Sequence, residues 1–206
     1  MQINYSKELE KKLLELKKEK ITPKLLLHSC CAPCSSYVLM YLTEYFNITV
    51  LYYNPNISPQ KEYEFRKSEQ KRLLSQMEFK NPVSFIDCDY DPLNFYENVK
   101  GYEKEPERGK RCEICYKMRL EKTAQIAKKH GFDYFATTLT VSPHKDAQKL
   151  NQIGETLQDK YGIKYLCSDF KKKNGYKISI DLSKKYNLYR QDFCGCIFSK
   201  NKEANQ

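Results

Sequence analysis

The sequence predicts an α/β fold built around a mostly parallel sheet. Short apolar strand patterns alternate along the chain with helical patterns, which is typical of a sheet flanked by helices. The first strand, a tight turn, a helix and a second strand fit into about thirty residues, and such a βαβ unit places its strands in parallel with a right-handed crossover. Because a domain holds roughly 150 residues, the 206 residues indicate one α/β domain at 23–200, preceded by a helical extension at 1–22 and followed by a tail at 201–206.

The elements of the first half follow from the spacing of apolar residues. Apolar side chains recur every three or four positions over residues 5–20 among Lys and Glu, which predicts an amphipathic helix that ends at Thr22-Pro23. Residues 24–28 form a short apolar run typical of a buried strand. The same criteria predict a helix at 36–46, a strand at 48–53, a charged helix at 63–78 and a strand at 83–88.

The second half begins with a polar stretch at 91–110 that is rich in turn residues. The clearest helix covers 113–130, because its apolar residues share one face and His130-Gly131 is a typical helix end. Further along we expect a strand at 134–139, a helix at 146–161, a short strand at 164–167 and then a loop-rich remainder.

Composition excludes several classes of protein. Hydrophobic residues make up 40% of the chain and aromatic residues 13%, so the chain is not expected to be disordered. No apolar run approaches the roughly 18 residues of a membrane-spanning helix, and the first twenty residues do not resemble a secretion signal. We therefore expect a soluble cytoplasmic protein. The net charge of +10 favours an anionic partner such as nucleic acid, although a solvated basic face is the alternative.

Seven of the nine cysteines fall into three groups: Cys30, Cys31 and Cys34; Cys112 and Cys115; Cys194 and Cys196. A reducing compartment does not sustain structural disulfides, so metal binding or redox chemistry is expected. The first group follows the first strand and begins a helix, at the sheet edge where open α/β folds bind ligands and where thiolates are favoured. Seven thiols exceed the four ligands of a structural zinc or a cubane cluster, which indicates a cluster plus a second thiolate site.

Alternative interpretations remain for individual groups. Cys31 and Cys34 have the spacing of a thioredoxin-like dithiol, and the two later pairs have the ligands for a four-cysteine zinc site. The adjacent side chains of Cys30 and Cys31 are expected to point in different directions, so that one serves each site. Cys88 and Cys167 lie in strand patterns and are expected to be buried.

Five motifs, in order over residues 23–200, resemble the QueH-type epoxyqueuosine reductases. They are Leu27-His28-Ser29-Cys30-Cys31-Ala32-Pro33-Cys34-Ser35; Tyr53-Asn54-Pro55-Asn56-Ile57 with Glu62, Arg66 and Gln70; Cys112-Glu113-Ile114-Cys115-Tyr116 with Arg119-Leu120; Thr137-Thr138-Leu139 with Ser142-Pro143 and Lys145; and Tyr189-Arg190-Gln191-Asp192-Phe193-Cys194-Gly195-Cys196.

The resemblance implies an oxidoreductase that reduces the epoxide of epoxyqueuosine, at the wobble position of a tRNA anticodon, to queuosine. It implies a 4Fe-4S cluster with an adjacent second iron and no cobalamin. It also implies a Rossmann-like sheet of the PP-loop (HUP-like) type, with cysteines at the turn where such proteins hold pyrophosphate. The alternatives are an ATP-dependent tRNA-modifying enzyme on this fold, disfavoured by the missing Ser-Gly-Gly-x-Asp-Ser loop, and a zinc-stabilised nucleic-acid-binding module without catalysis.

Roles for residues follow from the matched motifs. We expect Cys30, Cys31, Cys112 and Cys115 to hold the cluster, and Cys194 and Cys196, with Cys34, to hold the second metal. Opening an epoxide needs two electrons, protons and a Lewis acid such as a metal with an open position. The expected proton donors are Tyr116, Lys145 and Tyr189, and the expected substrate-binding residues are Tyr53, Asn54, Arg66, Arg119 and Arg190.

Other partners are expected at the surface. The basic runs 171–173 and 184–185 are expected to contact tRNA phosphates, and tyrosines can stack on a splayed base. His28 is expected to be a packed strand-end residue or to hydrogen-bond to a thiolate or substrate. Electrons would come from an external ferredoxin or flavodoxin. The helix at 5–20 is expected to cover its own domain rather than to make a dimer.

Overall fold

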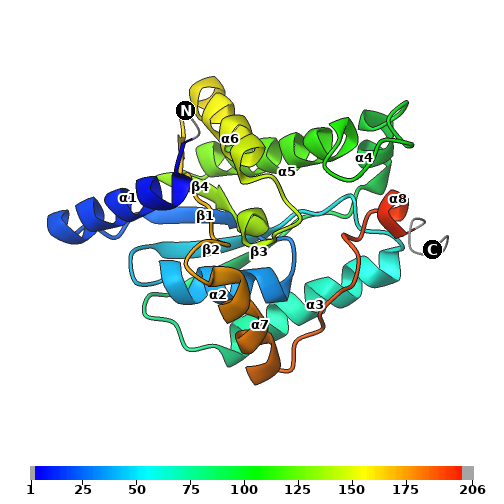
Figure 1. Ribbon diagram of the computed structural model, residues 1–206. Coiled ribbons are helices and arrows are strands. Elements are labelled where there is room, and N and C mark those ends of the chain that lie inside the picture. Colours follow the sequence, from blue (N-terminus) through cyan, green and yellow to red (C-terminus); the bar gives the residue numbers. More distant parts are fainter. Residues whose placement is uncertain (1–2, 201–206) are drawn as a thin grey trace.

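Five parallel strands form the centre of the structure, a computed structural model that describes residues 3–200 (Figure 1). The strands lie in the order β3-β2-β1-β4-β5. Their bounds are Lys24–His28 (β1), Asn47–Tyr52 (β2), Val83–Asp87 (β3), Tyr134–Thr137 (β4) and Lys164–Tyr165 (β5). Every pairing is parallel, which confirms the predicted α/β fold. The predicted tail at 201–206 and the first two residues of the predicted extension lie outside the described residues.

Helices cover both faces of this sheet. Figure 1 shows α5 and α6 on one face and α2 and α7 on the other. The helices are α1 (Tyr5–Glu19), α2 (Ala32–Leu42), α3 (Gln60–Gln76), α4 (Pro92–Asn98), α5 (Lys110–Lys129), α6 (Ala147–Tyr161), α7 (Gly175–Lys185) and α8 (Ile197–Lys200), with a 3₁₀ turn, η1, at Thr138–Val141.

The central strand β1 explains why the core has two parts. Leu25 and Leu27 pack into the cluster that contains α1 and α2, whereas Leu26 packs into the cluster that contains α5 and α6. All three are fully buried, as expected for a parallel strand covered on both faces. Burial of each leucine contributes roughly 1.5–3 kcal/mol. These contacts fix β1 and therefore the turn that follows it.

The strand order changes direction at β1. The chain winds outward through β2 and β3 on one side of β1, and then places β4 and β5 on the other side. His28 at the end of β1 is in register with Leu51 of β2 and Thr137 of β4. Open α/β sheets bind ligands outside the carboxyl ends of the strands at such a switch point. The β1–α2 turn lies at this position.

The structure differs most clearly from the predicted elements in four regions. Helix α2 begins at Ala32 rather than at residue 36, because Cys31 is the N-cap residue and a proline occupies the first turn. The predicted strand 134–139 ends at Thr137, where η1 begins. The polar stretch 91–110 contains α4, whose N-cap Asp91 accepts a hydrogen bond from the Asn94 amide. The predicted loop-rich remainder contains α7.

Within residues 3–200, no helix combines the length and the apolar character needed to cross a membrane.

Candidate metal centre

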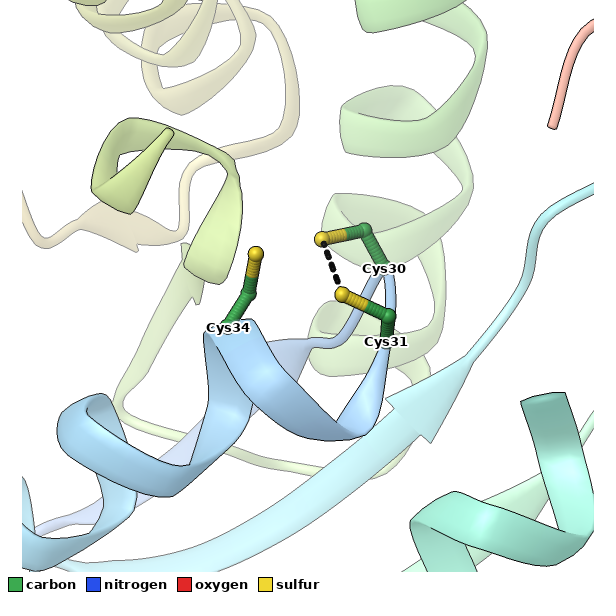
Figure 2. A group of neighbouring side chains, drawn as sticks. All are labelled: Cys30, Cys31 and Cys34. Carbon is green, nitrogen blue, oxygen red and sulfur yellow. Dashed lines mark hydrogen bonds between the residues drawn. The ribbon is translucent and has the colours of Figure 1, made fainter. Parts of the chain in front are cut away.

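The β1–α2 turn brings three cysteine sulfurs together. The Sγ atoms of Cys30, Cys31 and Cys34 all lie within 4.8 Å of one another. Figure 2 shows them on one side of the turn, with Cys30 and Cys31 joined by a 3.7 Å contact. The expectation that these two adjacent side chains point in different directions is wrong, because β1 has already ended at His28 and Cys31 begins the turn into α2. The alternation of a strand therefore does not apply to them.

The pKa values of the three thiols are shifted in different directions. The pKa of Cys31 lies well below its ordinary value, because the Cys30 and Cys34 thiols hydrogen-bond to its sulfur and outweigh the effect of burial. The contact with Cys31 raises the pKa of Cys30 to about 11, and the contacts with Cys30 and Cys31 raise the pKa of Cys34 well above its ordinary value. Among the three sulfurs, the arrangement therefore favours the thiolate at Cys31. A metal ion would displace the remaining protons.

A cavity of about 390 Å³ lies beside this turn. Cys30 and Cys34 line it from the turn, and Cys194 lines it from the segment between α7 and α8. We call residues 186–196 the return segment, because Figure 1 shows this stretch running back along α3. Cysteines more than 150 positions apart thus face the same space.

Cys194 forms a charged pair at the wall of the cavity. Lys145 Nζ donates a hydrogen bond to Cys194 Sγ at 3.1 Å. Burial would raise the pKa of this thiol, but the charges of Lys145 and Arg119 outweigh it and lower the pKa. Burial would likewise lower the pKa of Lys145, yet the Cys194 thiolate raises it. The arrangement favours a thiolate, which is the form that binds metals.

Cys112, Cys115 and Cys196 do not line the cavity. Cys115 and Cys196 are 7% and 8% exposed and share an apolar cluster with Phe95 and Val99. Burial raises the pKa of both thiols, that of Cys196 to about 12. Cys112 lies one turn before Cys115, in the first turn of α5. Within residues 3–200, the cysteines of the second and third groups form no set of three sulfurs as close as the first group.

Arg119 of α5 lies among all three groups. Its side chain is 2% exposed, and its Nε donates to the Cys115 carbonyl at 3.2 Å. Burial would lower its pKa, but nearby Cys115, Cys194 and Cys30 raise it. Its Nη2 atom is buried without a hydrogen-bond partner.

The residues present fit a thiolate-bound metal centre. Clustered cysteine sulfurs are the ligands that select iron–sulfur clusters or zinc. The orphaned donor of Arg119 and the ammonium of Lys145 both adjoin these sulfurs, so the surroundings favour a group with net negative charge.

The predicted substrate and proton-donor residues divide into two sets. Asn54, Arg66, Arg119, Arg190 and Lys145 line the cavity.

Three predicted tyrosines do not line the cavity. The Tyr53 hydroxyl accepts a hydrogen bond from Asn94, and the Tyr189 hydroxyl donates to Glu62. Tyr116 is 2% exposed and its hydroxyl has no partner. Burial raises the pKa of Tyr116 and Tyr189, so both phenols hold their protons firmly.

The predicted histidine is a packed residue. His28 is fully buried, with its ring nitrogens 3.0 Å from Thr137 Oγ1 and 3.1 Å from the Tyr53 carbonyl. Burial lowers its pKa to about 4, so the ring is neutral near pH 7. Cys88 and Cys167 are half-buried, which is more exposure than their strand patterns predict.

Two supporting contacts were not predicted from the sequence. Gln70 Oε1 accepts hydrogen bonds from Ser29 at 2.7 Å and Ser35 at 2.9 Å, which ties α3 to both ends of the cysteine turn. The serines that flank the cysteine motif are a signal for this contact. Arg108 donates to the carbonyls of Pro143 and His144 and so holds the loop that carries Lys145; nothing in the sequence pattern indicates this pairing.

Comparison with known proteins identifies similar chains. A family model described as "QueH: Epoxyqueuosine reductase QueH" matches residues 25–202. A protein of that name from Streptococcus pyogenes serotype M1 is 45% identical over 199 residues, covering 96% of this chain and 78% of the relative. Its namesake from Staphylococcus epidermidis is 44% identical over 206 residues, covering 98% and 87%. The one from Thermotoga maritima is 37% identical over 178 residues, covering 85% and 89%.

Proposed function

The chain belongs to the epoxyqueuosine reductase QueH family, and we propose that it converts epoxyqueuosine in tRNA to queuosine with an iron centre held by cysteines and without cobalamin. The observation that carries this proposal is the group of three sulfurs within 4.8 Å at the carboxyl end of β1. Family membership favours a reductase over the ATP-dependent enzyme and the zinc-stabilised binding module.

We propose a 4Fe-4S cluster and an adjacent second iron as the resident group. Cys30, Cys31 and Cys34 are the ligands that the geometry supports best, and Cys194 would contribute from the opposite wall of the cavity. The remaining three ligand candidates, Cys112, Cys115 and Cys196, do not line the cavity. When bound, such a group supplies electrons and a Lewis acid.

The chain's own residues would position the substrate and hold a proton. Conversion of an epoxide to an alkene consumes two electrons and two protons and releases the oxygen as water. Lys145 carries a proton at Nζ on the cavity wall, and the raised pKa keeps that proton in place near pH 7. An alkoxide is more basic than an amine, so Lys145 can protonate the opened epoxide oxygen. Tyr116 would then act through packing, and Tyr189 would act through its hydrogen bond to Glu62.

Substrate recognition would use the polar wall of the cavity. Asn54, Arg66 and Arg190 line it, and Arg190 is exposed at its rim. Tyr53 would act by packing beneath this wall. Arg190 also donates to Ser183 at 3.1 Å, which orients its guanidinium. We propose that Arg190 contacts a phosphate of the anticodon loop, because guanidinium groups bind phosphates in pairs of hydrogen bonds.

The basic surface would contact the rest of the tRNA. Lys184 and Lys185 are exposed at the end of α7, whereas Lys171 and Lys173 are paired with Asp169 and Glu10. We therefore propose the first two as the main phosphate contacts of the basic runs. Electrons would come from a ferredoxin or flavodoxin in the cytoplasm.

The test is anaerobic reconstitution with iron and sulfide, followed by incubation with epoxyqueuosine-containing tRNA and a strong reductant. Mass analysis of the nucleosides should show loss of one oxygen. Cys88→Ser is the matched control, because Cys88 lies outside the sulfur group and should retain iron and activity. Deoxygenation by protein stripped of iron would contradict the proposal.

A further inference from the structure

Three arginines of this chain are almost fully buried, and they differ in how their charge is compensated. Arg66, Arg111 and Arg119 are each 2% exposed. Arg66 forms an ion pair with Glu62 at 2.7 Å. Arg111 Nη1 donates to three backbone carbonyls, with distances of 2.6, 2.7 and 3.4 Å.

Among the described residues, Arg119 has no ion pair and donates to a single backbone carbonyl, whereas Arg111 reaches three. Its one hydrogen bond runs from Nε to the Cys115 carbonyl, and Nη2 has no partner. Within the described part of the chain, no carboxylate forms an ion pair with it, including Glu107 and Asp192, which line the same cavity. A buried charge without a partner costs several kcal/mol. Within the described residues, the compensating negative charge would therefore have to come from cysteine thiolates or from a group bound to them.

The residues around Arg119 indicate which groups can carry the compensating negative charge. Besides the neighbouring Tyr116, the groups that act on its charge are Cys115, Cys194 and Cys30, one from each cysteine group. Its guanidinium thus lies between the three segments that carry the candidate ligands. Guanidinium stays protonated at all pH values at which proteins are stable, so this is a permanent positive charge.

We propose that the charge of Arg119 compensates the thiolate-bound metal centre, and so favours both its retention and its reduced state. The inference rests on the proposed function, because it assumes the iron centre. Reduction adds one negative charge, and a fixed cation in a water-poor site stabilises that state more than it would in water. Net charge and exposure are among the factors that set the potential of an iron–sulfur cluster. Arg119 would in this sense act as a positioning residue for the centre.

The test compares Arg119→Gln with the charge-conserving Arg119→Lys. Both proteins are reconstituted anaerobically, their iron and sulfide are measured, and the midpoint potential is read from a redox titration followed by absorbance or electron paramagnetic resonance. We expect the Gln variant to hold on the order of tenfold less reduced centre at a fixed potential, equal to 59 mV for one electron. The Lys variant should lie near the wild type. Lys122→Gln removes an exposed charge one turn away on α5 and should leave the potential unchanged.

Each outcome either supports or overturns the proposed role of the Arg119 charge. A Gln variant that carries full iron at an unchanged potential would overturn the proposal, as would a Lys variant shifted as far as Gln. Loss of iron in Gln but not in Lys supports the role of charge, whereas loss in both would show that the shape of arginine matters instead. A wild-type protein with no reducible centre would contradict the proposed function and this inference with it, whereas a reducible wild type with an unchanged Gln variant would contradict this inference alone.

Discussion

The β1–α2 turn and the return segment bring cysteines to one cavity, but they are held by different kinds of contact. The turn continues directly from the central strand, and the Ser29 amide donates to the Leu51 carbonyl of β2 at 2.9 Å. The return segment has no strand pairing. Its backbone is held mainly by side chains of α3: Arg72 donates to the carbonyls of Tyr186 and Asn187, Glu69 accepts from the Tyr189 amide, and Arg66 donates to the Phe193 carbonyl.

This difference suggests a division of labour. The turn continues from the central strand and is tied to β2 by the Ser29 amide, so its three sulfurs are prearranged for a metal. The return segment depends on a few side-chain contacts, so its cysteines can be displaced without unfolding the core. Variants in the two regions should therefore fail in different ways.

The largest effect is expected at the turn. Cys31→Ser removes the thiolate around which Cys30 and Cys34 are arranged, so iron should fall to background after reconstitution. Activity should drop by more than the roughly 100-fold that loss of a supporting residue costs. The serine hydroxyl fits the same space, so the thermal unfolding of the iron-free protein should change little. Iron retained at the wild-type level would show that the turn does not hold the metal.

The sheet was predictable from sequence because its signals are local. The apolar run of β1, the helical spacing of α5 and the short connection between β1 and β2 each fix an element within a few residues. The sequence did not predict α4, α7 or the four-residue α8, because the first two are polar enough to resemble loops and the third is a single turn. What stabilises α7 is its contact with α2 and the core cluster, where Ile178 and Leu182 pack. That contact is not visible in a single stretch of chain.

The candidate site was predictable to different degrees in the two regions. A cysteine group after the first strand of a βαβ unit must lie at the carboxyl edge of the sheet, so the place of Cys30 follows from topology. The path of the return segment follows instead from Arg66 and Gly195, whose pairing across more than 120 residues no spacing indicates. The burial of Arg119 was also not apparent, because an arginine on a helix is ordinarily exposed.

Alanine substitutions at Gly195 and Gly101 distinguish the effect of backbone strain from the effect of displacing the return segment. Gly195 has a φ of +95° and a Cβ there would lie 3.0 Å from Ile57 and 3.1 Å from Arg66, whereas Gly101 has a φ of +86° and open space around it. Alanine at either position should cost about 1–3 kcal/mol of unfolding free energy. Only Gly195→Ala should also lower activity, on the order of 100-fold if Cys194 moves by about 1 Å. Urea unfolding and turnover measured on both variants check this, and equal activities would contradict it.

Two arginines of α3 contact opposite ends of the return segment, so variants of each can test the two ends separately. Arg66 contacts Phe193 next to Cys194, and Arg72 contacts the segment's start, far along the chain from the cysteines. Arg66→Met should cost roughly 1.5–3 kcal/mol, because Glu62 loses its charged hydrogen bond. It should also weaken iron retention by about tenfold. Arg72→Met should lower stability without changing iron content. Equal loss of iron in both variants would mean that the return segment moves as one unit, and would contradict the expectation that only its cysteine end affects iron retention.

The smallest effect is expected from Glu69, a carboxylate of α3 that contacts the return segment at Tyr189. Glu69 accepts from Arg72 at 2.7 Å and from the Tyr189 amide at 3.0 Å, and these hydrogen bonds lower its pKa below the ordinary 4.5, Arg72 contributing most. A carboxylate with a depressed pKa in the folded state stabilises the protein above pH 4.5, and that contribution is lost as the pH falls through the lowered value.

Glu69→Gln should therefore unfold about 0.5–1 kcal/mol more easily at pH 7. The difference from wild type should shrink as denaturant unfolding is repeated at successively lower pH, because the wild-type carboxylate then also becomes neutral. A gap that stays constant down to pH values well below 4.5 would mean that the amide disturbs the packing at Tyr189, and that charge does not hold this end of the return segment.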